Sequence, residues 1–321
     1  MKILYSIHLY LPKHACGAEK MLHDLAKFLI TKGHDVRVLL HQANQYKIKN
    51  PYEFEGVTVF PPDQKIIDGL MNWCDLVITH LDYTGQSVHL ANRYKKPVVW
   101  FAHSDHHYQS IKDATGKVGI VFNSEWVRKS LNYPHRSFVL TPPCDFRYYD
   151  VNKEPEKAEY ITLINLDYNK GGDILEKIAL AMPDKKFIAV KGSYAFDERG
   201  QHLSYPSNVK VLENTPDILS VYKQTRILLM PSKYESWGRT ATEAMCNGIP
   251  VICNPTEGLK ENCGMAGIYI KDRDSIEQWV VAIKKLDEPK AYKAASNKCK
   301  ARSRELDPQQ MLNAFNEWLL S

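Results

Sequence analysis

Short apolar runs rich in β-branched residues alternate along this chain with segments of helical periodicity, and this alternation constrains the fold more than any other feature. Such an alternation is typical of βαβ units and a mostly parallel sheet. A first helix is predicted from Ala18 to Lys32, where Gly33 ends it. Strands are predicted in the first half at Ile3–Ile7, Val36–Leu40, Val57–Phe60, Leu76–Thr79, Val98–Ala102, Gly119–Phe122 and Phe138–Leu140.

The alternation stops after Pro142-Pro143, in a charged, proline-containing stretch from Asn152 to Glu159, and then starts again. Because 321 residues suffice for two separate cores, we predict two consecutive α/β domains. The first covers residues 1–150, the second covers residues 151–304, and a C-terminal helix occupies residues 305–321. Open sheets of this kind bind ligands at the carboxyl ends of their strands, so the ligand site is expected in a cleft between the domains.

Composition excludes several classes of protein. The chain has 42 Lys and Arg against 37 Asp and Glu, a formal net charge of +5, which is too mild for a dedicated nucleic-acid binder. No apolar run approaches the roughly 18 residues of a membrane span, and the first residues do not resemble a secretory signal. Seven cysteines without close metal or redox spacing fit free thiols, so we expect a cytoplasmic protein. Eleven of the 12 histidines lie before residue 136.

The first loop joins a strand to a helix and contains one glycine, Gly17. Backbone N–H groups at such a helix start can bind an anion. A dinucleotide-binding fold would place a G-x-G-x-x-G motif here and an acidic residue at the end of the second strand. Neither is present, since the second predicted strand runs into His41. NAD binding is therefore not expected.

The segment from Arg226 to Val251 predicts a buried strand, a loop, a helix that begins near Trp237 or Gly238, and a second buried strand. A diphosphate at the start of that helix would meet unpaired N–H donors and the positive end of the helix dipole, and Arg239 could also reach it. Glu243, farther along the helix, could accept two hydrogen bonds from a ribose diol. Glu235, in the preceding loop, would face the group beyond the phosphates.

This segment resembles the donor-site signature of retaining glycosyltransferases of the GT-B fold, in the fourth sequence family (glycosyl transferases group 1). The resemblance rests on Pro231-Ser232, on two glutamates around Gly238, on Glu243-Ala244-Met245 and on Gly248-Ile249-Pro250-Val251. It implies two facing Rossmann-like domains and a last helix that crosses back to the first domain.

Further matches are the loop Gly17-Ala18-Glu19 and the run from Asn165 to Gly171, although Asn165 stands where the family commonly has Arg and Cys16 replaces a glycine. The resemblance implies that His103, after the strand Val98–Ala102, lies near the reacting carbon and that Glu235 orients the sugar. Lys191, after a strand of the second domain, is also assigned to the donor site. The residues assigned to donor binding are Gly17, Asn165, Lys170, Lys191, Ser236, Trp237, Gly238, Arg239 and Glu243.

Two patterns could indicate a metal. His103, His106 and His107 are closely spaced, but no acidic or cysteine partner is evident nearby in the sequence. Asp272-Arg273-Asp274 matches an Asp-x-Asp pair, but Asp274 with Glu277 is interpreted as the cap of a following helix. No metal or other cofactor is expected.

The expected activity is metal-independent transfer of a sugar from a nucleotide-diphosphate sugar, with UDP favoured and GDP next, to an acceptor hydroxyl with retention. Three alternatives stay open: a non-catalytic nucleotide-sugar-binding module, an epimerase of the same fold, and an enzyme in weak peripheral contact with membranes. The last rests on the basic first domain and on the segment Trp126–Leu131. The acceptor is not identified, and nucleic acid is not expected as a partner.

Overall fold

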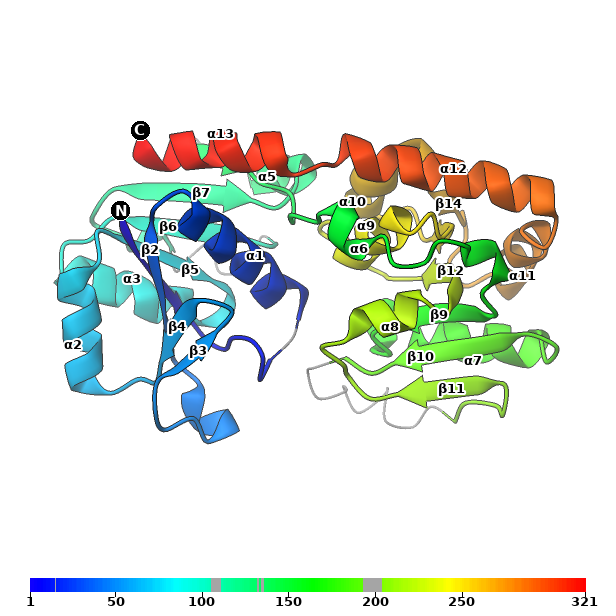
Figure 1. Ribbon diagram of the computed structural model, residues 1–321, viewed down its shortest axis with the longest axis horizontal. Helices are drawn as coiled ribbons and strands as arrows, with labels where there is room; N and C mark the ends of the chain where they lie inside the picture. Colours follow the sequence, from blue (N-terminus) through cyan, green and yellow to red (C-terminus); the bar gives the residue numbers. More distant parts are fainter. Residues whose placement is uncertain (15, 105–110, 132, 134–135, 193–203) are drawn as a thin grey trace. The chain divides into compact units, whose positions relative to one another are not determined.

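The structure is a computed structural model that describes residues 1–321 except 15, 105–110, 132, 134–135 and 193–203 (Figure 1). The chain divides into two compact units. Unit 1 consists of Met1–Pro143 together with Gln309–Ser321, and unit 2 consists of Cys144–Pro308. Each unit is described by itself.

The described strands of unit 1 form an eight-stranded sheet in the order β3-β4-β2-β1-β5-β6-β7-β8. Every pair is parallel except β3–β4, which is antiparallel. Ile7 pairs with Leu40, so β1 and β2 end level with each other. The strands are β1 (Lys2–Ile7), β2 (Asp35–Leu40), β3 (Tyr52–Phe54), β4 (Val57–Phe60), β5 (Leu76–His80), β6 (Val98–Ala102), β7 (Val118–Phe122) and β8 (Ser137–Val139).

Helices of unit 1 pack apolar faces against this sheet. Helix α1 (Gly17–Thr31) buries Met21, Leu22, Leu25 and Leu29, which follow the 3.6-residue period that predicted the helix. It ends before Gly33, whose φ of 81° is a left-handed conformation that favours glycine. The other elements are η1 (Ala43–Tyr46), α2 (Gln64–Trp73), η2 (Leu81–Tyr83), α3 (Thr84–Arg93) and α5 (Glu125–Leu131).

The last helix of the chain, α13 (Gln309–Leu320), belongs to unit 1 (Figure 1). Its Phe315 is fully buried, with ring centroids 6.0 Å from Phe101 and 5.6 Å from Phe138. Its Asn316 Oδ1 lies 2.7 Å from His34 Nε2, just after α1. Burial of one such aromatic side chain contributes about 1.5–3 kcal/mol, so α13 is part of the core of unit 1.

The described strands of unit 2 form a six-stranded sheet in the order β11-β10-β9-β12-β13-β14, in which every pair is parallel. Because both faces of a parallel sheet are covered by helices, its strands are apolar along most of their length. They are β9 (Tyr160–Ile164), β10 (Lys186–Val190), β11 (Val209–Leu212), β12 (Thr225–Met230), β13 (Val251–Cys253) and β14 (Ile268–Tyr269).

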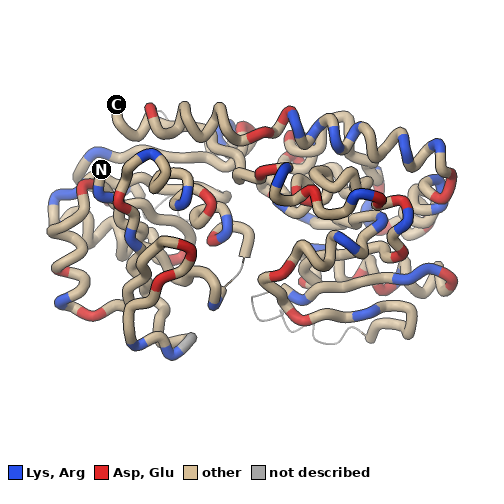
Figure 2. Tube along the Cα trace, viewed as in Figure 1, with Lys and Arg blue, Asp and Glu red and all other residues tan. Residues whose placement is uncertain are grey.

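The helices of unit 2 follow the predicted alternation, and Figure 2 shows that Lys and Arg gather along α12. The core of the unit centres on residues such as Ile174, Phe187 and Trp279. The elements are α6 (Phe146–Tyr149), η3 (Pro155–Lys157), η4 (Tyr168–Lys170), α7 (Gly172–Ala181), α8 (Ile218–Tyr222), α9 (Arg239–Cys246), α10 (Glu257–Cys263), η6 (Gly264–Ala266), α11 (Ile276–Lys285) and α12 (Pro289–Glu305).

The predicted capping pair of α11 was wrong. The N-cap residue of the helix is Ser275, which makes no side-chain cap hydrogen bond, and Asp274 lies one residue earlier. Asp274 Oδ1 instead accepts a hydrogen bond of 2.8 Å from Arg273. The Arg273 side chain is largely buried and also donates to the backbone oxygen of Pro231 at 2.6 Å. Asp272 Oδ1 accepts from the Asp274 backbone N–H at 3.1 Å, so the Asp-x-Asp sequence forms a turn.

Helices long and apolar enough to cross a bilayer do not occur in the part of the chain that the structure describes.

Candidate functional site

The carboxyl ends of the parallel strands in unit 2 bring the predicted donor-site segments to one edge of the sheet. Strand β9 lies between β10 and β12, so the loops that follow these three strands are neighbours. They contain Asn165 to Lys170, Lys191, and the loop from Pro231 to Gly238. This edge is where open α/β sheets bind ligands.

Lys170 and Glu235 form an ion pair at this edge. Lys170 Nζ lies 2.7 Å from Glu235 Oε1, and Ser232 Oγ donates to the same oxygen at 2.8 Å. The Glu235 side chain is 12% exposed and that of Lys170 is 32% exposed, so both can reach a ligand. An ammonium group suits an anion and a carboxylate suits hydroxyl groups, and here the two are held in contact.

The loop that carries Glu235 is fixed by contacts from α10. Asn262 Nδ2 donates to the backbone oxygens of Trp237 at 3.0 Å and Gly238 at 2.9 Å. Gly258 lies close to the backbone of this loop. A Cβ on Gly258 would be 2.3 Å from the backbone oxygen of Glu235 and 2.4 Å from the carbonyl carbon of Ser236. The carboxylate is therefore held on a rigid backbone.

Gly238 forms the start of α9. Its φ is 82°, a left-handed conformation that glycine adopts without strain. The first N–H groups of a helix have no acceptor within the helix, and the helix dipole makes this end positive. Trp237, which precedes Gly238, is 3% exposed and so supports the turn from within the unit. The start of α9 is a suitable position for a phosphate group.

Arg239 and Glu243 form a buried ion pair on α9. Arg239 Nε lies 2.7 Å from Glu243 Oε1, and each side chain is 7% exposed. Tyr222 donates to Glu243 Oε2 at 2.8 Å, and Arg239 Nη2 donates to Tyr149 at 3.0 Å. Burial, followed by the Glu243 charge, raises the pKa of Tyr222 well above its usual value, so the phenol remains a donor. Arg239 and Glu243, both predicted to bind the donor, thus already make polar contacts within the protein.

Sequence reasoning missed the two tyrosines of this network. Tyr149 lies in α6 and Tyr222 in α8, and both are buried. No local pattern in the sequence connects Tyr149 with Arg239 or Tyr222 with Glu243, because these contacts depend on how three helices pack on the sheet. A buried phenol needs a hydrogen-bond partner, and that requirement was the one available signal.

Asn165 shapes the first loop of the site. Its φ of 76° is left-handed, a conformation that Asn tolerates better than most residues. Its Oδ1 accepts from the Asp167 backbone N–H at 3.1 Å, and a Cβ on Gly192 would lie 2.6 Å from the same atom. A turn residue at this position explains why the chain has Asn here and not Arg.

The surroundings of Lys191 give weaker support for a role in donor binding. Its Nζ lies 2.6 Å from Glu213 Oε1, but the Glu213 side chain is 82% exposed, so solvent screens this pair.

His103, the candidate of unit 1, lies in a group of histidines. Strands β2, β1, β5 and β6 are neighbours, and a histidine stands at or just after the carboxyl end of each: His41, His8, His80 and His103. His103 Nε2 lies 3.2 Å from His80 Nδ1. Burial is the main cause that lowers the pKa of His103 to about 4, so its imidazole is neutral at pH 7.

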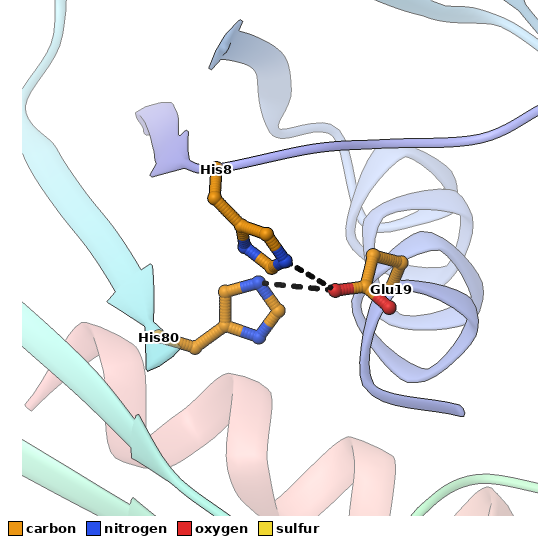
Figure 3. Close-up of side chains that lie close together, drawn as sticks. All are labelled: His8, Glu19 and His80. Carbon is orange, nitrogen blue, oxygen red and sulfur yellow. Dashed lines mark ion pairs between the residues drawn. The ribbon is translucent and has the colours of Figure 1, made fainter. Parts of the chain in front are cut away.

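An acidic partner for His8 and His80, which the sequence did not reveal, is Glu19 in the first turn of α1. Its side chain is fully buried, and Oε1 lies 3.1 Å from His8 Nε2 and 4.0 Å from His80 Nε2 (Figure 3). Gly17, two residues earlier, begins α1, and a Cβ there would meet no atom within 4 Å. His106 and His107 lie outside the described residues.

Comparison with known proteins identifies the fold first. The Anabaena protein HepE, solved with UDP-glucose, superimposes with a TM-score of 0.75 over 99% of this chain and 100% of that one, at 19% sequence identity. Sucrose-phosphate synthase from Thermosynechococcus elongatus gives a TM-score of 0.79 over 100% of this chain and 98% of that one, at 12% identity. The chain therefore has the GT-B fold predicted from its sequence.

The family follows from the sequence of unit 2. Residues 151–305 match the family described as glycosyl transferases group 1. A D-inositol 3-phosphate glycosyltransferase from Corynebacterium kroppenstedtii is 32% identical over 95 residues, which are 28% of this chain and 21% of that protein. The chain thus spans about a fifth of the length of this relative. Unit 2 is a glycosyl transferases group 1 domain, as the sequence motifs predicted.

Proposed function

We propose that this protein is a glycosyltransferase that moves a sugar from a nucleotide-diphosphate sugar to an acceptor hydroxyl. The observation that carries the proposal is the pair Lys170–Glu235, held at 2.7 Å beside the start of α9 in a group 1 domain. The ammonium group and the helix start would bind the diphosphate, and the carboxylate would bind hydroxyls of the sugar. UDP is the favoured nucleotide, because HepE was solved with UDP-glucose, and GDP is next.

The donor would bind with its phosphates at the α9 start and its ribose toward Glu243. Arg239 and Lys170 are each paired with a glutamate at 2.7 Å, but the Arg239 side chain is 7% exposed and that of Lys170 is 32% exposed. Lys170 is therefore the principal cation for the diphosphate in this proposal. Ser236, Trp237 and Gly238 would contribute through the backbone. Glu243 could still accept from a ribose, since each carboxylate oxygen has two acceptor positions.

Transfer would proceed with retention and without a metal. As the sugar–oxygen bond breaks, the leaving diphosphate gains negative charge, and the fixed donors of unit 2 would stabilise that charge. The family resemblance implies that the leaving phosphate accepts the proton of the acceptor hydroxyl on the same face of the sugar. His103 would lie near the reacting carbon from unit 1, as a neutral hydrogen-bonding group at pH 7.

Substitution of Glu235 tests the proposal. UDP-glucose, UDP-N-acetylglucosamine and GDP-mannose are first screened by thermal shift, since a ligand at 100 times its dissociation constant stabilises by about 2.7 kcal/mol. Donor hydrolysis is then followed by release of the nucleotide diphosphate. Glu235→Gln should abolish release, whereas Glu257→Gln should not, because Glu257 is exposed and paired with Lys260 at 2.8 Å. Equal release by both variants would refute the role of Glu235.

The same assay separates the alternatives. A non-catalytic module would bind a nucleotide sugar tightly and release no diphosphate, with or without acceptors. An epimerase would convert the donor to an isomer in the absence of an acceptor.

A third possibility, weak peripheral membrane contact, rests on Arg128 and Lys129 of α5, which are exposed. Co-sedimentation with anionic vesicles at low and moderate salt tests that contact.

A further inference from the structure

We infer that unit 1 contains a binding site for a divalent transition-metal ion of the zinc type, with His8, His80 and Glu19 as ligands. The nearest ring nitrogens and carboxylate oxygen of these residues all lie within 4.8 Å of one another. His14 and Cys16, together with Glu19, form a second group with the same spacing and supply candidates for the fourth ligand. The inference does not depend on the proposed transferase function.

The burial of Glu19 calls for a positive charge nearby. Its side chain is 0% exposed, and among the described residues neither of its oxygens accepts a hydrogen bond. The His8 Nε2 atom, at 3.1 Å, is close to Oε1 but not aligned as a hydrogen-bond donor. An ionised carboxylate in such surroundings is costly unless a cation balances it. A metal ion between the three side chains would supply that charge.

The geometry fits a zinc ion. Zinc binds imidazole nitrogens and carboxylate oxygens at about 2.0–2.2 Å, so two ligand atoms in a tetrahedral site lie about 3.4 Å apart. The distances from Glu19 Oε1 to His8 Nε2 and His80 Nε2, 3.1 Å and 4.0 Å, lie on either side of that value. Figure 3 shows both imidazole rings directed at the carboxylate, with the histidines on one side and α1 on the other.

The second ring nitrogen of His80 is oriented as in known metal sites. Histidine ligands usually donate their other N–H group to a neighbouring acceptor, which fixes the tautomer and the ring plane. His80 Nδ1 lies 3.2 Å from His103 Nε2, so His103 would be this outer partner. The metal would thus set the orientation of the ring that the proposed mechanism places near the reacting carbon.

The ligand types select the metal. Imidazole with carboxylate, and a thiol in reach, suits Zn²⁺, Co²⁺ or Ni²⁺, whereas Mg²⁺ and Ca²⁺ prefer sites made only of oxygen. Two of the three ligands follow strands of the sheet or end them, and the third lies in the first turn of a 15-residue helix. Such rigid elements hold ligands with little rearrangement.

Metal binding to the full-length, untagged chain tests the inference. The protein is stripped with EDTA, and Zn²⁺ is titrated against a chromophoric chelator, with the zinc content then measured by mass spectrometry. The wild-type protein should retain one ion per chain. Glu19→Gln and His80→Asn should each weaken binding by at least about 100-fold, and His103→Asn by about 10–100-fold, as expected for an outer partner.

Two control variants remove a histidine elsewhere in unit 1. His89→Asn changes an exposed residue of α3. His23→Asn changes a buried histidine whose Nε2 lies 3.3 Å from Glu55 Oε2, a pair outside the proposed site. Both should bind zinc as the wild type does. Circular dichroism establishes whether each variant is folded.

A second measurement uses the unaltered protein, in case the ligand variants do not fold. Co²⁺ should give visible absorption bands of low-symmetry coordination, and Zn²⁺ should displace them. Wild-type protein that binds neither ion would overturn the inference, and so would zinc binding that survives Glu19→Gln. If ring ¹⁵N spectra show His8 doubly protonated and unchanged by zinc, a proton balances Glu19 and the metal site is refuted.

Discussion

The guanidinium of Arg239 contacts the carboxylate of Glu243 at 2.7 Å, one turn farther along α9, with each side chain 7% exposed. Removal of one partner from a buried pair leaves an uncompensated charge, which costs about 3–5 kcal/mol. We therefore expect Arg239→Met to lower the free energy of unfolding of unit 2 by about that amount. Urea unfolding followed by circular dichroism measures the change.

The double variant Arg239→Met with Glu243→Gln provides the control, because it removes both charges. It should be more stable than Arg239→Met alone, which a double-mutant cycle would report as coupling. A loss below about 1 kcal/mol in the single variant would mean that the pair is as weak as an exposed one.

Lys170→Met should weaken UDP binding by roughly tenfold to a hundredfold, since a hydrogen bond to a charged group contributes about 1.5–3 kcal/mol. Isothermal titration calorimetry with UDP measures the affinity. Lys233→Met is the matched control: Lys233 is exposed, and its ammonium lies 3.9 Å from the centroid of the Tyr168 ring in the same region. Equal losses in the two variants would point to a general effect of charge and not to a contact of Lys170.

Gly258→Ala should reduce the turnover of the enzyme strongly while the protein still folds. The added Cβ would lie 2.3 Å from the backbone oxygen of Glu235, so the loop that carries Glu235 must move. Such overpacking costs about 1–3 kcal/mol. Thermal unfolding and diphosphate release are measured together. Gly69→Ala is the control: in α2 the new Cβ has no atom within 4 Å, so this variant should be neutral or stabilising. Unaltered turnover in Gly258→Ala would contradict the expectation.

His41 should make unit 1 sensitive to acid. Burial, then the charge of His8, lowers the pKa of His41 to about 4, while Ser6 Oγ lies 2.8 Å from its Nε2. The unfolded chain, with a pKa near 6.5, binds the proton more readily than the folded one. This contribution to stability is therefore complete above pH 6.5 and declines as the pH falls toward 4.

Between pH 7 and pH 5, the loss attributable to His41 amounts to about 2 kcal/mol. We expect His41→Gln to show a smaller decrease in unfolding free energy over this range than the wild type does, in buffers that contain EDTA. His89→Gln, which alters an exposed histidine, should follow the wild-type curve. Parallel curves for all three proteins would exclude His41 as the source.

Much of the fold could be predicted because it depends on local patterns. Apolar runs and glycine stops placed β1, α1 and β2 within a residue or two of their bounds. The short strand β3 was missed: Tyr52–Phe54 is half-exposed and pairs antiparallel with β4, so it lacks the apolar run of a buried strand. The predicted Asp274 cap was wrong because the N-cap residue is Ser275. Asp274 accepts a hydrogen bond from Arg273, which also donates to the backbone oxygen of Pro231, 42 positions earlier, and no local pattern encodes that contact.

The candidate site divides in the same way. Glu235, Gly238 and Glu243 lie in one continuous segment, so their spacing was visible in the sequence. The partners of these residues were not, because Lys170 is 65 positions from Glu235 and Tyr222 is 21 positions from Glu243. The contact of Glu19 with His80 likewise depends on how α1 packs on the sheet, which no local pattern encodes.

Unit 1 is built from two stretches of chain, with the whole of unit 2 between them. During synthesis, the sheet of unit 1 would leave the ribosome long before the helix that covers Phe101 and Phe138 has been made. Unit 2, a continuous segment, can form its core in the meantime. Residues 309–321 therefore complete the core of unit 1 at the end of synthesis. Removal of these 13 residues should expose an apolar face of unit 1 to solvent and cause the protein to aggregate.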